Sequence, residues 1–138
     1  NIATSGIEIY NLRINQIKNL NENLLIINDK NNYPFTINYK ILDSFYDPNL
    51  CISQYTEHLY NLRSYDKNYG GSKIGPHKSD IFAFINKDID ASELSTGQQK
   101  TIVLMTLIAK CNYMIKVKNE GVGPSEQINS IGCSIKWK

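Results

Sequence analysis

Residues 93–110 read ELSTGQQKTIVLMTLIAK, and they join side chains that can bind a phosphate to a segment that must be buried. Two hydroxyls, a glycine and two glutamines stand directly before an almost unbroken apolar run. A run of this length and composition predicts a buried helix of a globular protein, which we place at about residues 97–116. The question for function is whether the polar residues only begin this helix or also bind a ligand.

Two overlapping capping boxes fit the helix start, Ser95 with Gln98 and Thr96 with Gln99. In each box the hydroxyl accepts a hydrogen bond from a backbone N–H, and the glutamine side chain reaches back to the capping residue. Such a cap stabilises a helix by roughly 1 kcal/mol and requires no chemistry. A purely structural role therefore accounts for these four residues.

Gly97 is the residue that capping does not explain. Glycine in a helix costs about 0.5–1 kcal/mol relative to alanine. Its bare backbone lets an oxygen-rich ligand approach closely, and the positive end of the helix dipole favours an anion. The Ser95 hydroxyl, the Gly97 N–H and the dipole together predict a phosphate-binding edge.

A second candidate is the segment GGSKIGPHKS, residues 70–79, which has the glycine spacing of a P-loop between Gly70 and Gly75. Pro76 and His77 separate the second glycine from the lysine, so the G-x-x-x-x-G-K-[ST] pattern fails. Proline also has no N–H to offer a phosphate. We therefore predict that this segment is a turn without P-loop function.

The charged side chains of this region have two interpretations. His77 is expected to be a hydrogen-bonded structural residue, because nothing near it has the spacing of metal ligands. Lys78, with Lys73 and Lys100, can face the phosphates of a nucleotide or of DNA. The alternative is that all three lysines are simply solvated.

Apolar periodicity predicts the elements that position these residues. A helix is expected from Ile7 to about Asn28, packed on its own domain or, alternatively, forming a coiled-coil arm. Residues 35–41 alternate as a half-buried strand does, and a second helix is expected over 51–65. A short strand over 81–85 and a tight turn then lead into the helix that follows Ser95.

Composition is that of a folded chain of 138 residues, 41% hydrophobic and 20% charged, which supports one domain or part of a larger one. The formal charge of +2 does not by itself indicate nucleic-acid binding. Three widely separated cysteines indicate neither a disulfide framework nor a zinc site and favour a reducing cytosol. The start NIATSG has no signal-peptide features, so we expect an internal or processed start, and no membrane span is predicted.

Residues 94–99, LSTGQQ, resemble the signature motif of ABC-type ATPases. The longer series, in which GPHKSD, a strand and then LSTGQQK precede an apolar helix, resembles the RecF family of recombination-repair proteins. The motif S-x-G-Q alone is common by chance, whereas its pairing with GPHKSD is specific. The resemblance covers roughly residues 7–116 and is firm over residues 75–110.

The resemblance implies an α+β fold, with lid-like helices and a short mixed sheet leading into the signature helix, as a fragment of an ABC-type P-loop NTPase fold. In such ATPases two protomers sandwich ATP between the P-loop of one and the signature of the other. Ser95 is then expected to donate its hydroxyl to the γ-phosphate and Gly97 its backbone N–H. Thr96, Gln98 and Gln99 complete the nucleotide-binding motif, and the partner half-site supplies Mg²⁺.

For partners, the family resemblance implies DNA, both single-stranded and at junctions with double strands, with RecR and RecO acting beside an ATP-dependent homodimer. Lys73, Lys78 and Lys100 are the residues that we assign to nucleic acid. The expected location is the cytoplasm, with no membrane contact.

Cleavage of ATP needs more than a signature, because phosphoryl transfer depends on a P-loop lysine, a metal ion and acidic residues. Glu120 and Glu126 occupy the region where paired acidic residues are expected, but neither ends an apolar strand. We assign no catalytic residue, and the sequence does not decide whether the chain is an enzyme. A non-catalytic interaction module and a truncated remnant are the alternative interpretations.

The sequence divides into three parts on these observations. Residues 1–73 form a lid-like region of helices and a strand, and residues 74–116 form the signature subdomain with both motifs. Residues 117–138 are expected to be an irregular tail, because glycine, proline and serine replace the periodic apolar residues.

Overall fold

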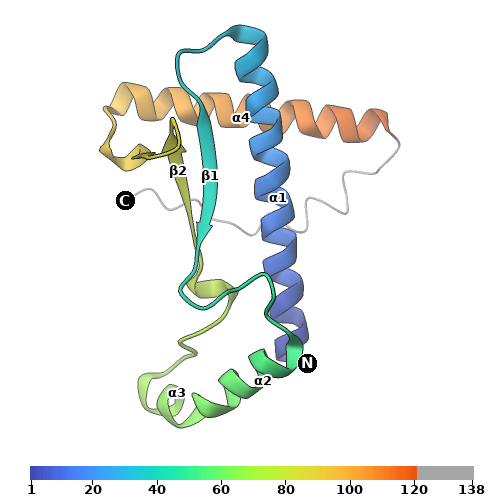
Figure 1. Ribbon diagram of the computed structural model, residues 1–138, viewed down its shortest axis with the longest axis vertical. Coiled ribbons are helices and arrows are strands. Elements are labelled where there is room, and N and C mark those ends of the chain that lie inside the picture. Colours follow the sequence, from blue (N-terminus) through green and yellow to red (C-terminus); the bar gives the residue numbers. More distant parts are fainter. Residues whose placement is uncertain (121–138) are drawn as a thin grey trace. The chain divides into compact units, whose positions relative to one another are not determined.

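The computed structural model describes residues 1–120, and Figure 1 shows the course of the chain. The elements in order are α1 (Ile2–Asn31), β1 (Ile37–Leu42), α2 (Ile52–Asn61), α3 (Arg63–Tyr69), the 3-10 turn η1 (Pro76–Lys78), β2 (Asp80–Ile85), β3 (Ile89–Asp90), the 3-10 turn η2 (Ala91–Glu93) and α4 (Thr96–Asn119). Helices combined with a small sheet make this an α+β fold, as predicted.

The chain forms two compact units, and neither is a continuous stretch of sequence. Among the described residues, the first unit consists of residues 1–14 and 41–80, and the second of residues 15–40 and 81–120. Helix α1 contributes residues to both units. The units therefore do not follow the division at residue 73 that motif positions suggested.

Helix α1 is longer at both ends than its apolar periodicity predicts. The side chain of Asn1 accepts a hydrogen bond from the Ala3 N–H (3.0 Å), which stabilises the first turn. After Asn31 the chain enters the left-handed region at Asn32 (φ 52°), and Pro34 follows. Both features are typical of a helix end.

The predicted second helix over 51–65 is in fact two helices. Leu62 (φ −88°, ψ −4°) is the single residue between them, the C-cap of α2 and the N-cap of α3. Helix α3 ends at Gly70, which has a left-handed backbone (φ 75°) and donates its N–H to the Asp66 carbonyl (2.9 Å). Apolar spacing alone does not reveal the break, because both helices keep the same period.

The sheet has the order β1-β2-β3 among the described residues, and it is antiparallel rather than mixed as predicted. Strands β1 and β2 run in opposite directions (Figure 1), and β2 pairs antiparallel with β3, Ile85 facing Ile89. Asn86 and Lys87 both have positive φ (49° and 82°), which reverses the chain between these strands. The tight turn was predicted, whereas β3 was not.

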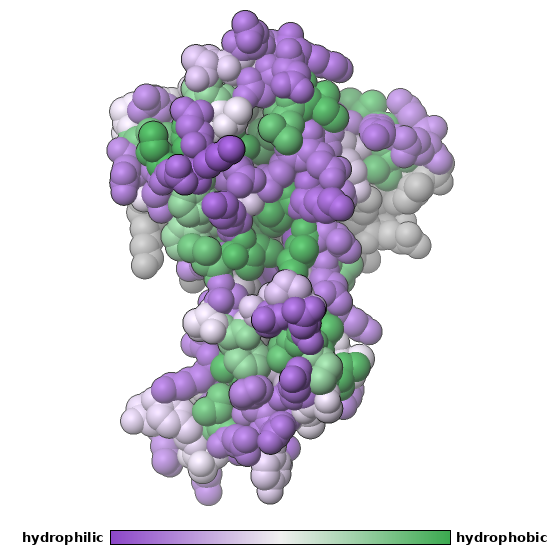
Figure 2. Space-filling model, viewed as in Figure 1, coloured by the Kyte–Doolittle hydropathy of each residue, from purple (hydrophilic) through white to green (hydrophobic). Residues whose placement is uncertain are grey.

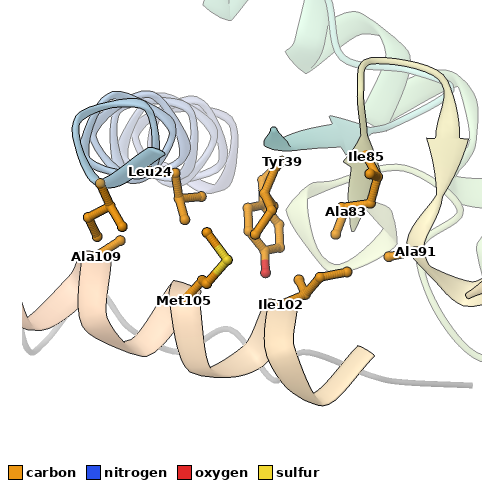
Figure 3. Close-up of a cluster of buried hydrophobic side chains, with 10 residues drawn as sticks. Leu24, Tyr39, Ala83, Ile85, Ala91, Ile102, Met105 and Ala109 are labelled. Carbon is orange, nitrogen blue, oxygen red and sulfur yellow. The ribbon is translucent and has the colours of Figure 1, made fainter. Parts of the chain in front are cut away.

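The core of the second unit forms where α4 meets the strands and the C-terminal half of α1 (Figure 3). Ile102, Met105 and Ala109 lie on one face of α4 because they are three, four and seven positions apart. The hydroxyl of Tyr39 hydrogen-bonds to the Thr106 hydroxyl (2.7 Å), which satisfies a polar group inside an apolar cluster. The other buried members of this cluster are Leu24, Ile27, Ile37, Ala83, Ile85 and Ala91.

The first unit has a smaller core, which is rich in tyrosine. Tyr10 and Tyr55 are almost completely buried. The Tyr10 hydroxyl donates to Asp43 Oδ2 (2.9 Å), and its ring stacks on Tyr46 with centroids 4.2 Å apart. Burial, and after it the hydrogen bond to Asp43, raise the pKa of Tyr10 above its ordinary value.

Figure 2 shows hydrophilic residues over much of one face, with apolar residues gathered in patches between them. On the side of α4 away from its buried residues, four large apolar side chains are exposed, Leu104, Leu107, Ile108 and Ile115. No helix in the described part of the chain is long and apolar enough to cross a membrane. Helix α4 continues three residues beyond the predicted end at Lys116, and the rest of the predicted tail, with Glu126, lies outside the described residues.

Candidate functional site

The candidate phosphate-binding edge is the beginning of α4. Ser95 is the capping residue, with an extended backbone (φ −61°, ψ 155°). Its Oγ accepts a hydrogen bond from the Gln98 N–H (3.4 Å), and Gln98 Oε1 accepts from the Ser95 N–H (3.1 Å). The first predicted capping box is thus present. The Ser95 hydroxyl also lies 3.1 Å from Gln98 Oε1, to which it donates.

The second predicted capping box, Thr96 with Gln99, is wrong. Thr96 is the first residue of the helix, and the Gln99 side chain turns to the preceding 3-10 turn. Gln99 Nε2 donates to the carbonyls of Ala91 (3.1 Å) and Ser92 (3.3 Å). These carbonyls belong to the 3-10 turn that precedes the helix, so Gln99 joins η2 to α4 instead of capping.

The 3-10 turn η2 is itself capped. Asp90 Oδ1 accepts a hydrogen bond from the Ser92 N–H (2.8 Å), and this bond lowers the pKa of the Asp90 carboxyl. Leu94, between η2 and α4, packs against the core cluster. The chain that leads into Ser95 is therefore held by hydrogen bonds and by apolar contact.

Gly97 is exposed in the first turn of α4, and the protein's own packing does not require a glycine there. A Cβ atom added at Gly97 would meet no atom within 4 Å. The first N–H groups of a helix have no carbonyl partner within the helix. Ser95, Thr96 and Gln98 are exposed as well, so a ligand can reach this edge from solvent.

The structure brings three of the predicted residues to one hollow beside the edge. The hollow has a volume of about 410 Å³, and its lining includes Thr96, Gln99, Lys100, Val103 and Leu104. Lys100 therefore lies one turn beyond Thr96, on the same side of α4. A cation at this place can add to the attraction of the helix N-terminus for an anion.

The GPHKSD segment forms the turn η1 and then enters strand β2, with Lys78 and Ser79 at the junction. A P-loop instead leads from a strand into a helix, so this segment has the wrong order of elements. His77 Nε2 donates to the Ser72 carbonyl (2.9 Å), in agreement with the structural role predicted for it.

Arg13 of α1 holds the same turn, and sequence reasoning missed it. One guanidinium nitrogen donates to the Pro76 carbonyl and to Ser79 Oγ (2.6 Å). An arginine within the periodic apolar pattern of 7–24 was the available signal, since a half-buried cation needs a partner.

The three lysines assigned to nucleic acid fall in different places. Lys73 and Lys78 are exposed in the first unit, and Lys100 belongs to the second. The Lys73 Nζ lies 3.5 Å from the centroid of the Tyr65 ring. Within the described residues no three His, Cys, Asp or Glu side chains are grouped so as to hold a metal ion.

Comparison with known proteins gives partial matches to proteins named DNA replication and repair protein RecF. The protein from Rickettsia canadensis is 39% identical over 82 residues, which is 59% of this chain and 22% of the relative. Those from Rickettsia rickettsii (strain Sheila Smith) and Rickettsia felis are 42% identical over 67 residues and 43% over 63, covering 48% and 45% of this chain and 19% and 17% of the relatives. The chain thus spans about a fifth of the length of these relatives. No family model and no solved structure matches it.

Proposed function

This chain carries a fragment of RecF-family sequence, and from that premise we propose that it acts in DNA replication and repair as the signature-bearing part of a RecF-like ATPase. In this proposal the start of α4 binds ATP that is held by the P-loop of another protomer. The chain supplies one side of the nucleotide site, and the other protomer supplies the P-loop and Mg²⁺.

The observation that carries the proposal is the exposed, unobstructed Gly97. Because a Cβ there would meet nothing within 4 Å, the fold gains nothing from a glycine that costs helix stability. A ligand that approaches the bare backbone explains the residue. The exposed Ser95 hydroxyl beside it and the positive helix end suit an anionic ligand.

The residues present fit the phosphate end of ATP. The Ser95 hydroxyl now donates to Gln98 Oε1, and rotation of this hydroxyl redirects its hydrogen to a phosphate oxygen while Oγ keeps the Gln98 N–H. The Gly97 N–H adds a second donor. Gln99 lines the hollow beside this edge, and its bonds to η2 fix the direction in which the helix begins.

The family's remaining partners are proposed on the same premise. We propose that the chain acts on DNA, both single-stranded and at junctions with double strands. Its proposed protein partners are RecR and RecO, and its proposed assembly is an ATP-dependent homodimer. Location in the cytoplasm is part of this proposal. Lys73, Lys78 and Lys100 stay the candidate phosphate contacts.

An association assay tests the nucleotide part. The labelled chain is mixed with the RecF protein of Rickettsia canadensis, and its capture is compared in Mg²⁺ with ATP and with ADP. Gly97→Asp is the test variant. A carboxylate in the first turn interacts favourably with the helix dipole, so the helix stays intact, while its negative charge repels phosphate. Gly71→Asp is the matched control, since its Cβ also meets nothing within 4 Å and the charge change is the same.

We expect ATP to increase capture of the wild type and of Gly71→Asp, and to have no effect on Gly97→Asp. Equal capture of all three in ATP would contradict the proposal.

A second candidate function, a protein-interaction module, is favoured by the exposed apolar side chains of α4. Leu104 and Ile115 are 61% and 59% exposed, and large apolar side chains grouped on the exposed side of a helix are typical of a protein-interaction surface. If the chain is an interaction module, its capture should be equal in ATP and ADP. The Leu104→Glu substitution should abolish that capture. The same assay therefore separates the two candidates.

A further inference from the structure

The outer side of α4 carries a continuous row of exposed apolar side chains. We call this row the α4 seam, and its members are Leu104, Leu107, Ile108, Cys111 and Ile115. They follow one another at helical spacing, which places them on one side of the helix. Figure 3 shows Ile102, Met105 and Ala109 on the opposite side, where they face α1 and the strands. The seam therefore has no contact with the core that holds α4.

The spacing of the seam indicates the shape of its partner. Leu104, Ile108, Cys111 and Ile115 are separated by four, three and four positions. This is the spacing at which the side chains of one helix pack into the gaps of another. From Lys100 to Lys118 the helix is roughly 27 Å long, because each residue adds about 1.5 Å. A partner helix of similar length can contact the whole seam.

The charges around the seam all have one sign. Helix α4 holds four of the 15 lysine and arginine residues of the chain and none of its 13 acidic residues. Lys100 and Lys118 are exposed at the two ends of the seam, and Lys110 lies on its flank. Burial lowers the pKa of Lys110 below its ordinary value. A carboxylate from a partner would favour the charged form of this lysine.

Two other occupants fit the seam less well. A second copy of the chain would place the lysines of one α4 against those of the other, and like charges across an interface oppose association. A helix that lies on a bilayer carries its lysines on the face opposite its apolar face. In α4 the opposite face is instead buried in the core of the second unit. The seam therefore suits a protein partner whose charges are negative.

We propose that the α4 seam binds a helix of a partner protein whose apolar stripe is flanked by aspartate or glutamate. The apolar side chains of the partner pack between those of the seam, and its carboxylates pair with Lys100, Lys110 and Lys118. The proposal rests on the second candidate function and specifies the shape and the charge of the partner. It requires neither ATP nor Gly97.

Selection from three libraries of displayed helical peptides tests the proposal on the whole chain without ATP. Each peptide has roughly 18 residues, the length of the seam with its flanking lysines. All libraries vary the same stripe positions among leucine, isoleucine, methionine and phenylalanine. The flanking positions hold glutamate in the first library, lysine in the second and glutamine in the third. Fluorescence anisotropy then measures the affinity of each selected peptide.

Two substitutions of matched type locate the binding site. Ile115→Ser removes an apolar side chain from the seam without adding charge. Leu25→Ser is the control, because Leu25 is 52% exposed on α1 and also belongs to the second unit. Far-UV circular dichroism confirms that each variant is folded. Vesicles of phosphatidylglycerol are the probe for binding to a membrane.

We expect binders from the glutamate library, with affinities that fall as salt is raised. Ile115→Ser should weaken their binding about 5- to 30-fold, and Leu25→Ser should change it little. Replacing Lys110 and Lys118 together by glutamine should reduce the dependence on salt.

Binders that come equally from the lysine or glutamine library, or equal affinity of wild type and Ile115→Ser, would overturn the proposal. So would the absence of any binder, and binding to vesicles in that case would point to a membrane. A dimer of the chain that Ile115→Ser dissociates would point to a second copy. The capture assay with RecF contains no peptide, so the proposed function and this inference can fail separately.

Discussion

Replacing Gly75 by alanine should destabilise the first unit, because the backbone there is accessible only to glycine. Gly75 has φ 137° and ψ 169°, a region that side chains exclude. An alanine Cβ would also lie 3.0 Å from His77 Nδ1 and 3.2 Å from the Tyr55 hydroxyl oxygen. Tyr55 is 2% exposed and cannot move without disturbing the core.

The magnitude follows from these two terms. Backbone strain of this kind costs about 1–3 kcal/mol, and overpacking of a buried site costs about 1–3 kcal/mol more. We therefore expect Gly75→Ala to lower the free energy of unfolding by about 2–6 kcal/mol, a large part of the stability of a small protein.

Urea unfolding followed by circular dichroism measures this loss, with peptide-resolved hydrogen exchange over residues 69–80 to locate it. Gly71→Ala is the control, since its Cβ meets no atom within 4 Å and its backbone is not in the left-handed region. This variant should be neutral or more stable by about 0.4–1 kcal/mol. If both variants unfold at the urea concentration of the wild type, the structural role of Gly75 is refuted.

Three further predictions use the same unfolding assay. Ile102→Ala should cost about 2–5 kcal/mol because Ile102 is fully buried, whereas Leu104→Ala, at an exposed site, should cost less than about 0.5 kcal/mol; equal losses would contradict the assigned core. Ser95→Ala should cost about 1 kcal/mol through loss of the cap, and an unchanged midpoint would show that the capping box contributes nothing. Because burial and Asp43 raise the pKa of Tyr10, its contribution to stability is complete below the unfolded pKa of about 10 and is lost as pH rises above it. Tyr10→Phe should therefore flatten the fall in stability at alkaline pH, and an unaltered pH profile would contradict this assignment.

The elements were predictable from sequence where periodicity was long and strong. Helices α1 and α4 and strands β1 and β2 appear near their predicted residues, because each buries a face with its own period. The break at Leu62 was not predictable, since it leaves the apolar spacing unchanged. Strand β3 was missed because it contains two residues, too few to show alternation.

The candidate site was predictable in its residue types but not in all of its bonds. Ser95 and Gln98 form the expected box because cap and partner are close in sequence. Gln99 had an alternative that sequence does not show, the carbonyls of η2. Arg13 and the turn it holds are more than 60 positions apart, a distance at which no local pattern reports contact. The pairing of Lys73 with Tyr65 likewise depends on the reversal at Gly70.

The central claim is that Gly97 serves a ligand and not the fold. Its most direct test is the ATP-dependent capture of Gly97→Ala by RecF, with the urea midpoint of the same variant as a control. We predict that alanine leaves stability unchanged or raises it by up to about 1 kcal/mol, while the effect of ATP on capture is lost. A stable Gly97→Ala variant that is captured in ATP as well as the wild type would contradict the claim.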